Sequence, residues 1–336
     1  MNRERYETIS GAFSQSRVLV IGDLILDQFV WGRVSRISPE APVPVVEVDR
    51  ETQYPGGAAN VARNLREFSR HAAVLGMIGA DAEAETLKGL LADEGIQIEG
   101  VQQDPGYHTI VKTRIIARHQ QVVRVDREQK LRPTQAQFDR AIACLEGMLP
   151  HLDAVIVEDY GKGLIQQGFA DEITARVRAA GRLLAIDPNP HNPLNWHGAT
   201  VMKPNRSEAF AAAGRPHSEP VDPVEADEAV QEVGRILLDK WACEILLITL
   251  GEQGMMLFRP GEASYHTPTR AKEVFDVSGA GDTAIALFTL ALSAGASADE
   301  AAEISNHASG IVVGKLGTAT VSPAELLRSF SGPEGH

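Results

Sequence analysis

Cysteine, long apolar runs and net positive charge are what this sequence has least of. Its two cysteines, Cys144 and Cys243, have no partner at metal-binding spacing, and so small a number indicates a reducing compartment. No apolar run approaches the roughly 20 residues of a membrane helix, and residues 1–16 lack the apolar core of a signal peptide. We therefore expect a cytoplasmic protein with no membrane partner.

Acidic residues outnumber basic ones, and the formal charge of the 336 residues is −13. A nucleic-acid-binding protein usually presents a basic face, so this balance argues against nucleic acid as a partner. It suits a protein that acts on small molecules, although ordinary solubility accounts for it equally well. The hydrophobic fraction of 43% is enough for a large core, either in one α/β domain with an excursion or in two modest domains.

Apolar runs and helical patterns alternate along most of the chain. A continuous β-branched run such as 17–23 (RVLVIGD) is typical of a strand buried on both faces. Further strands are expected at 72–79, 154–159, 183–187, 199–205 and 245–251, and helices at 82–93, 134–148, 167–180, 207–213 and 226–240. This alternation predicts a mostly parallel sheet flanked by helices, with ligands bound beyond the carboxyl ends of the strands.

Two segments depart from this alternation. Residues 28–49 contain Pro39, Pro42 and Pro44, and prolines restrict a strand to a sheet edge or to a flap outside the main sheet. Residues 109–118 and 120–126 alternate apolar and basic side chains, which predicts a half-exposed hairpin. We expect the segments at about 28–50 and 107–127 to form a small β-sheet lid within a single domain of residues 1–330, followed by a loose tail at 331–336.

The segment with the strongest chemical signal is 276–292, DVSGAGDTAIALFTLAL. Gly279 and Gly281 allow a tight turn into an apolar helix, whose first N–H groups are free to bind an anion. Asp282 falls in the first turn, where the helix dipole favours an ionised carboxylate. A carboxylate beside an anion hole can accept the proton of an alcohol during phosphoryl transfer. The alternative is an aspartate that merely caps a helix after a glycine turn.

The same run resembles the second signature, D-T-x-G-A-G-D, of the ribokinase-like (PfkB) sugar kinases, with Ser278 as a small polar variant. The resemblance covers nearly the whole chain and implies a ribokinase-like α/β fold and ATP-dependent phosphorylation of a sugar. It makes Asp282 the catalytic base and places Gly279, Ala280 and Gly281 in the anion hole. The Walker pattern GxxxxGK[ST] does not occur in the sequence.

The resemblance extends to the sugar side of the site. PGGAANVARNL resembles the first signature of the family, which implies that Gly56, Gly57 and Asn60 approach the sugar hydroxyls. Asp27, after the first strand, matches the family's acceptor for a sugar hydroxyl. Taken alone, the two glycines would be a plain helix-entry turn and Asp27 an ordinary loop residue.

Other matches concern the metal ions. KPNRSE resembles the family's N-x-x-E motif, which places Asn205 near the nucleotide and Glu208 near Mg²⁺ through water. A helix cap by Asn205 with a glutamate in the first turn fits the same residues equally well. Asp276 and the loop after Gly314 resemble a monovalent-cation site, which implies K⁺ as a further cofactor.

The nucleotide itself is matched by two segments. TLGEQG resembles the nucleotide loop, and this implies that Thr249, Gly251 and Gly254 lie near the phosphates and ribose. Asn306 matches a position beside the adenine. The alternatives are a generic tight turn for the loop and a helix-surface asparagine for Asn306.

Several segments resemble one group within the family, the kinases of D-glycero-β-D-manno-heptose 7-phosphate. They are GDLILDQFVWGRVSRISPEAPVPVVEV, PGGAANVA, TRIIARHQQVVRVD, DYGKG and DVSGAGDT. The resemblance implies phosphorylation of the anomeric 1-hydroxyl to the 1,7-bisphosphate, a step toward ADP-heptose and the lipopolysaccharide core. Other substrates of the family, such as ribose, fructose or a hexose phosphate, remain alternatives, as does a non-catalytic sugar or nucleotide sensor, which would be marked by a broken GAGD.

A sugar that already carries a phosphate needs cations away from the ATP end. The basic residues in question are Lys112, Arg114, Arg124 and Lys162, with Arg36 as a further candidate. A solvated basic face is the alternative for any one of them. Asn189 stands where relatives usually carry a lysine, so a phosphate contact by that lysine is not expected here.

Two expectations concern partners. Many relatives carry a C-terminal nucleotidyltransferase with an HxGH-type motif, and this sequence has none, so the kinase activity alone is implied. Lid strands with an open edge need a partner, and a homodimer through the lids would supply one.

Overall fold

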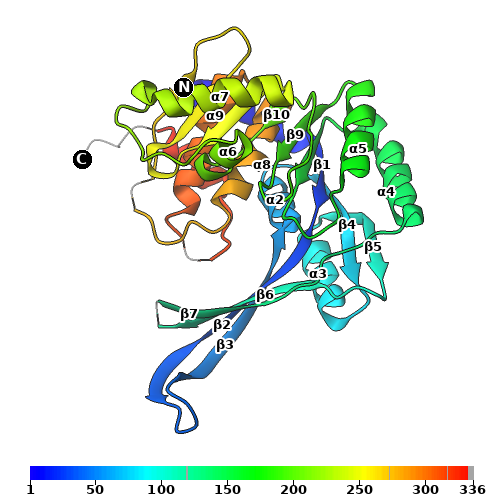
Figure 1. Ribbon diagram of the computed structural model, residues 1–336, viewed down its shortest axis with the longest axis vertical. Helices are drawn as coiled ribbons and strands as arrows, with labels where there is room; N and C mark the ends of the chain where they lie inside the picture. Colours follow the sequence, from blue (N-terminus) through cyan, green and yellow to red (C-terminus); the bar gives the residue numbers. More distant parts are fainter. Residues whose placement is uncertain (119, 272, 316, 332–336) are drawn as a thin grey trace.

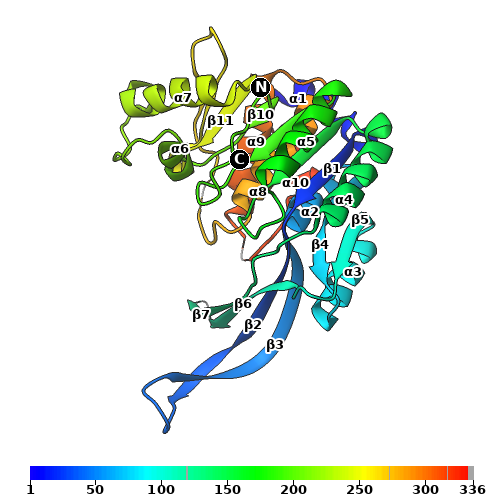
Figure 2. The same cartoon turned by 45° about the vertical axis from the view of Figure 1, so that its right-hand side comes forward.

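The computed structural model describes residues 1–118, 120–271, 273–315 and 317–331. These residues form an α/β body from which a long, curved β arm projects (Figures 1 and 2). The tail expected at 331–336 lies outside the described residues, apart from Ser331.

The main sheet confirms the predicted α/β class. Over the described residues it has nine strands, in the order β13-β12-β11-β10-β9-β8-β1-β4-β5. Only the pairings of β12 with β11 and β13 are antiparallel. The strands are β1 (Arg17–Gly22), β4 (His71–Gly79), β5 (Gln97–Asp104), β8 (Ala154–Glu158), β9 (Leu183–Asp187), β10 (Val201–Met202), β11 (Ile245–Thr249), β12 (Met255–Phe258) and β13 (Tyr265–Thr267).

Helices cover both faces of this sheet. Alternate residues of β1 belong to different cores: Val18 and Val20 pack on one face, and Leu19 and Ile21 on the other. The first face is covered by α1 (Arg3–Ser10), α2 (Ala58–Arg66), α3 (Ala82–Asp93), α8 (Ala280–Ser293), α9 (Ala298–Val312) and α10 (Pro323–Ser329). The second is covered by α4 (Gln135–Met148), α5 (Gln167–Ala179), α6 (Arg206–Ala212) and α7 (Glu228–Trp241).

The arm is a second sheet with the strand order β3-β2-β6-β7, and we call it the lid. Its strands are β2 (Leu24–Ile37), β3 (Pro44–Gly57), β6 (Ile110–Ala117) and β7 (Gln120–Arg127). β2 begins one residue after β1 ends, and β3 returns to Gly57, immediately before α2. The only residue between β1 and β2 is Asp23, whose carbonyl accepts a hydrogen bond from Ala58 N–H (3.1 Å). Both long strands therefore leave the body at one point.

Three local expectations were incomplete. Helices α1 and α10 were not expected, and they meet through Tyr6 and Phe330, whose rings stack 4.5 Å apart. The strand expected at 199–205 is only β10, because Pro204 has no N–H to extend the ladder.

Across the described residues, no helix combines the length and apolar character that a bilayer crossing requires.

Candidate active site

Helix α8 begins where several strand ends meet. Gly279 is its N-cap with φ 81°, a left-handed conformation, and a Cβ there would lie 3.0 Å from Nδ2 of Asn60. The N–H of Ala280 donates to the carbonyl of Val277 (3.2 Å), while the first intrahelical bond runs from Thr283 N–H to Gly279 (2.9 Å). The donors left for an anion at this helix end are therefore the N–H groups of residues 281 and 282 rather than that of Ala280.

Asp282 is buried in the first turn of α8, with 8% of its surface exposed. Its Oδ2 accepts a hydrogen bond from Nδ2 of Asn60 (2.7 Å), and its Oδ1 accepts one from the hydroxyl of Tyr160 (2.7 Å). Burial raises the pKa of Asp282, while these two bonds and the ammonium of Lys203 lower it. The expectation that the helix dipole alone keeps this carboxylate ionised was therefore incomplete, because it left out the cost of burial.

The residues predicted to face a sugar gather at the root of the lid. Asp27 is buried on β2 and accepts a hydrogen bond from Arg114 (2.5 Å). A Cβ on Gly56 would lie 2.3 Å from Oδ2 of Asp27, and one on Gly57 would lie 2.5 Å from the carbonyl oxygen of Asp23. The charge of Asp27 raises the pKa of Asp282, so the two carboxylates lie close enough to repel each other.

The basic side chains of the hairpin lie on the same lid face as Asp27. Lys112 is the register partner of Asp27, and Arg114 that of Arg124. The Nζ of Lys112 lies 5.5 Å from the centroid of the Tyr160 ring, and burial, followed by the charges of Lys162 and Arg124, lowers its pKa against the pull of Asp27.

The other basic residues predicted for this group are either paired with carboxylates or lie far from it. The guanidinium of Arg124 is held by Asp126 at 2.8 and 2.9 Å, and Lys162 pairs with Glu128 at 2.6 Å. Arg36 lies near the far end of β2 and is exposed, so the structure does not bring it to this group.

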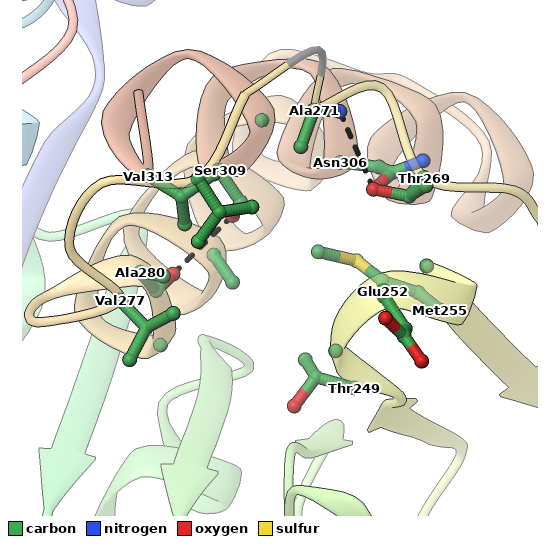
Figure 3. Close-up of a pocket in the computed structure, with 16 residues that line it drawn as sticks. Thr249, Glu252, Met255, Thr269, Ala271, Val277, Ala280, Asn306, Ser309 and Val313 are labelled. Carbon is green, nitrogen blue, oxygen red and sulfur yellow. Dashed lines mark hydrogen bonds between the residues drawn. The ribbon is translucent and has the colours of Figure 1, made fainter. Parts of the chain in front are cut away.

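A cavity of about 480 Å³ lies between the β11–β12 turn and helices α8 and α9. Figure 3 shows Thr249, Glu252 and Met255 on one side of it, opposite Val277, Ala280, Ser309 and Val313. Its walls carry mostly small and apolar side chains, which suit a flat aromatic ring.

Three predicted residues shape this cavity. Gly251 and Gly254, in the turn, have φ 60° and 89°, and a Cβ on Gly254 would lie 2.1 Å from the carbonyl oxygen of Thr267. Asn306 is buried rather than on the helix surface, and its amide donates to Oγ1 of Thr267 (3.0 Å) and to the carbonyl of Pro268 (2.6 Å). The alternative of a surface asparagine was therefore wrong.

A second cavity of about 600 Å³ adjoins the first and reaches Asp282. Lys203 is buried there, with its Nζ 2.8 Å from Oδ2 of Asp187. Burial raises the pKa of Asp187 to about 7 and also raises that of Glu158, whose Oε1 has no hydrogen-bond partner among the residues that the structure describes. The cavities share Thr249, Gly251, Val277 and Gly281, so an elongated ligand can extend from one into the other.

Comparison with known proteins agrees with this arrangement. Residues 15–325 match the profile of the pfkB family carbohydrate kinases. The chain belongs to this family. It is an ATP-dependent sugar kinase, as the sequence predicted.

Two relatives are each named bifunctional protein HldE. The one from Desulfatibacillum aliphaticivorans is 43% identical over 314 residues, which is 94% of this chain and 63% of the relative. The one from Vibrio atlanticus is 41% identical over 322 residues, or 96% of this chain and 65% of the relative. The chain thus spans less than two thirds of the length of these relatives.

Solved structures confirm the ribokinase-like fold of this pfkB kinase. Arabidopsis thaliana ribokinase, complexed with ribose and ATP, has a TM-score of 0.68 at 17% identity, covering 94% of this chain and 98% of that one. Phosphofructokinase-2 from Escherichia coli, in complex with substrates and products, has a TM-score of 0.74 at 18% identity with the same coverage. At such identities the likeness concerns the fold alone.

The N-x-x-E segment of this pfkB kinase caps helix α6 and borders the second cavity. Oδ1 of Asn205 accepts from the N–H of Glu208 (2.9 Å), and Oε2 of Glu208 accepts from the N–H of Asn205 (2.7 Å), so the two form a capping box. Glu208 also lines the second cavity. The described residues contain no group of three or more His, Cys, Asp or Glu side chains able to hold a metal directly. The cavity is lined by the carboxylates of Glu158, Asp187 and Glu208, and carboxylate oxygens suit a hard cation that keeps several of its own waters.

The segments predicted to form a monovalent-cation site do meet. Oδ1 of Asp276 accepts from the N–H of Ser278 (2.9 Å), and its Oδ2 accepts from the N–H of Gly317, in the loop after Gly314 (3.1 Å). Asn189, at the position of the missing lysine, lines the second cavity.

Sequence reasoning missed four residues of the site: Tyr160, Glu158, Asp187 and Lys203. A signal for them was available. Glu158 and Asp187 are carboxylates at the ends of two buried strands, where ligands bind in parallel sheets. Lys203 is the first residue of the KPNRSE segment already singled out for Asn205, but its contact with Asp187 could not be read from the sequence.

Proposed function

We propose that this kinase transfers the γ-phosphoryl group of ATP to the anomeric 1-hydroxyl of D-glycero-β-D-manno-heptose 7-phosphate, yielding the 1,7-bisphosphate for ADP-heptose and lipopolysaccharide core synthesis. The observation that carries the proposal is the position of Asp282, buried between the second cavity and the acidic root of the lid. The identity to the HldE proteins and the basic lid face favour this sugar over ribose or fructose.

In this proposal Asp282 is the general base. The sugar is held between Asp27 and the segment of Gly56, Gly57 and Asn60, so that its 1-hydroxyl reaches a free lone pair of the Asp282 carboxylate. Asp282 accepts the proton as that oxygen attacks the γ-phosphorus. The free N–H groups at the start of α8 and the ammonium of Lys203 stabilise the negative charge that develops on the transferring group.

The adjoining cavities support the placement of ATP. The adenine occupies the smaller, apolar cavity, whose wall Asn306 braces. The ribose and phosphates pass Thr249, Gly251 and Gly254 toward α8 and the second cavity. Glu208, with Asn205 at the same helix start, would hold Mg²⁺ through water, and that ion would offset phosphate charge.

The charge distribution supports a phosphorylated sugar. The charge of Lys162 lowers the pKa of Lys112, so the two ammonium groups repel each other, and a phosphate bound between them would offset that repulsion once Lys162 leaves Glu128. We propose that they bind the 7-phosphate, that Arg114 orients Asp27, and that Arg124 joins the phosphate by leaving Asp126. Asn189 makes no charged contact in this arrangement.

An activity panel with Asp282→Asn tests the proposal. We expect Asp282→Asn to lose about 10²–10⁴-fold in turnover while nucleotide still binds, because a general base contributes an effect of that size. The exposed Asp171→Asn is the matched control and should behave as the unaltered enzyme. ADP release is measured with heptose 7-phosphate, ribose and fructose 6-phosphate, each varied in concentration. Near-normal turnover of Asp282→Asn would refute the base, and a higher kcat/KM on another sugar would refute the substrate.

Two further proposals concern assembly and ions. The lid has open edges at β3 and β7 and exposes Val43, Val48, Val123 and Val125, which favours a homodimer through the lids, with the lid and body of residues 1–330 acting as one domain. A monomer by light scattering at working concentration would contradict the homodimer.

K⁺ beside Asp276 is tested by replacing K⁺ with a large organic cation and measuring turnover.

A further inference from the structure

Tyr160 follows β8 directly, and its backbone is held in place by several hydrogen bonds. Oδ2 of the buried Asp23 accepts from the N–H of Tyr160 (3.2 Å) and from that of Lys162 (3.0 Å). The turn is completed by Gly161 and Gly163, at φ 70° and 105°. The position of the Tyr160 ring is therefore set by the end of β1 rather than by a flexible loop.

Among the residues that the structure describes, the Tyr160 hydroxyl makes one hydrogen bond, and it is with the proposed base. Its hydroxyl lies 2.7 Å from Oδ1 of Asp282, and because an ionised carboxylate can only accept, the hydroxyl donates. The amide of Asn60 donates to the other oxygen, Oδ2, at 2.7 Å. Each carboxylate oxygen keeps a second lone pair, so the carboxylate is held at both oxygens and can still accept a proton.

The charges around Asp282 explain why such a donor matters. The charged groups near Asp282 come from the neighbouring strands: Asp27 on β2, Glu158 on β8, Asp187 on β9 and Lys203 after β10. The ammonium of Lys112 lies over the face of the Tyr160 ring. Three of these five are carboxylates, and they disfavour a further negative charge. Burial also raises the pKa of Tyr160 well above its usual value, so its hydroxyl remains a donor at every working pH.

We propose that Tyr160 is a positioning residue for the catalytic base: its hydroxyl sets the rotation of the Asp282 carboxylate and stabilises the ionised form that accepts the proton of the sugar. The inference rests on the proposed function only in taking Asp282 as the base. Tyr160 acts through Asp282 and makes no bond to the substrate.

The test is the pH dependence of kcat/KM in Tyr160→Phe, which removes one oxygen and leaves the ring under Lys112. Without the donor, the ionised carboxylate is less stable, and its pKa rises. We expect the acid limb of the profile to move up by roughly one pH unit or more, since a bond to a charged group is worth about that much. The rate should recover toward that of the unaltered enzyme at alkaline pH.

Tyr107→Phe is the matched control. Tyr107 is buried and Tyr160 partly buried, but the side-chain donors to Asp282 among the described residues are Asn60 and Tyr160, not Tyr107, so the acid limb of Tyr107→Phe should stay in place. A second measurement does not depend on the folding of Tyr160→Phe: incorporation of 3-fluorotyrosine makes the hydroxyl a stronger donor and should move the acid limb down. An acid limb that stays in place in both Tyr160→Phe and the fluorinated enzyme would overturn the inference.

The inference and the proposed function fail in different ways. If Asp282→Asn retains near-normal turnover, the base assignment falls, whatever Tyr160 does. If Asp282→Asn is inactive and Tyr160→Phe lowers the rate equally at every pH, the base stands and Tyr160 is a packing residue only.

Discussion

A single methyl group at Gly56 should disturb the sugar side of the site. Gly56 is the register partner of Ile25 on β2, and an added Cβ would lie 2.3 Å from Oδ2 and 2.8 Å from Cγ of Asp27. Asp27 cannot rotate away freely, because it is buried and its other oxygen is held by Arg114. Gly56→Ala therefore has to displace the Asp27 carboxylate or bend β3.

The size of the effect follows from the cost of crowding. Overpacking by one methyl group typically costs about 1–3 kcal/mol. If that cost is borne by the sugar-binding geometry, it corresponds to roughly a 5- to 150-fold rise in the KM for the sugar. The nucleotide cavity lies against α8 and α9 and shares no lining residue with this contact, so ATP affinity should be unchanged.

The assay measures ADP release over a range of sugar phosphate concentrations, with ATP binding followed by calorimetry. Gly89→Ala is the control, because a Cβ there would meet no described atom within 4 Å; it should leave KM unaltered and stabilise α3 by about 0.5–1 kcal/mol. Unfolding of Asp27→Ala with and without Gly56→Ala supplies a double-mutant cycle, in which the cost of the methyl should largely vanish. An unchanged sugar KM in Gly56→Ala would refute the reasoning.

The remaining predictions concern stability. Burial lowers the pKa of His307 to about 4, so the unfolded chain takes up the proton at a higher pH than the folded chain does. The free energy of unfolding is therefore highest above about pH 6.5 and falls by about 3 kcal/mol as the pH drops toward 4. Urea unfolding across this range should show a weaker pH dependence in His307→Asn, and equal slopes would contradict the prediction. Lys203→Met removes a buried ammonium, leaves the half-buried carboxylate of Asp187 without its cation and should cost about 3–5 kcal/mol. The surface control Lys88→Met should cost less than about 1 kcal/mol, and similar losses in the two variants would contradict the prediction.

Local patterns were enough to predict much of the fold. The helix expected at 82–93 has those bounds in the structure, because Asp81 caps it and Leu87 and Leu91 bury one face. The lid strands were expected from their prolines and alternating basic residues, although the lid begins earlier than expected. Helix α1 was missed because it buries only Tyr6 and Ile9, and its packing depends on Phe330 at the other end of the chain.

The candidate site was only partly predictable. The glycines and Asp282 follow from local backbone requirements, since a positive φ and a helix start are properties of short segments. The contact of Tyr160 with Asp282, and that of Lys203 with Asp187, join residues far apart in the chain. Such contacts depend on strand order and on the direction of side chains at strand ends, neither of which a single sequence specifies.

The way the lid leaves the body makes it a cantilever. Its two long strands leave the body at one point, next to Asp23. The carbonyl of Asp23 accepts a hydrogen bond from the N–H of Ala58, and its carboxylate accepts hydrogen bonds from the N–H groups of Tyr160 and Lys162. In a clamped beam the deflection grows with distance from the clamp, so thermal bending displaces the free end between Ile37 and Pro44 far more than Asp27 near the root. A partner that grips the free end would therefore damp the tip while leaving the sugar-facing end in the shape that the root imposes.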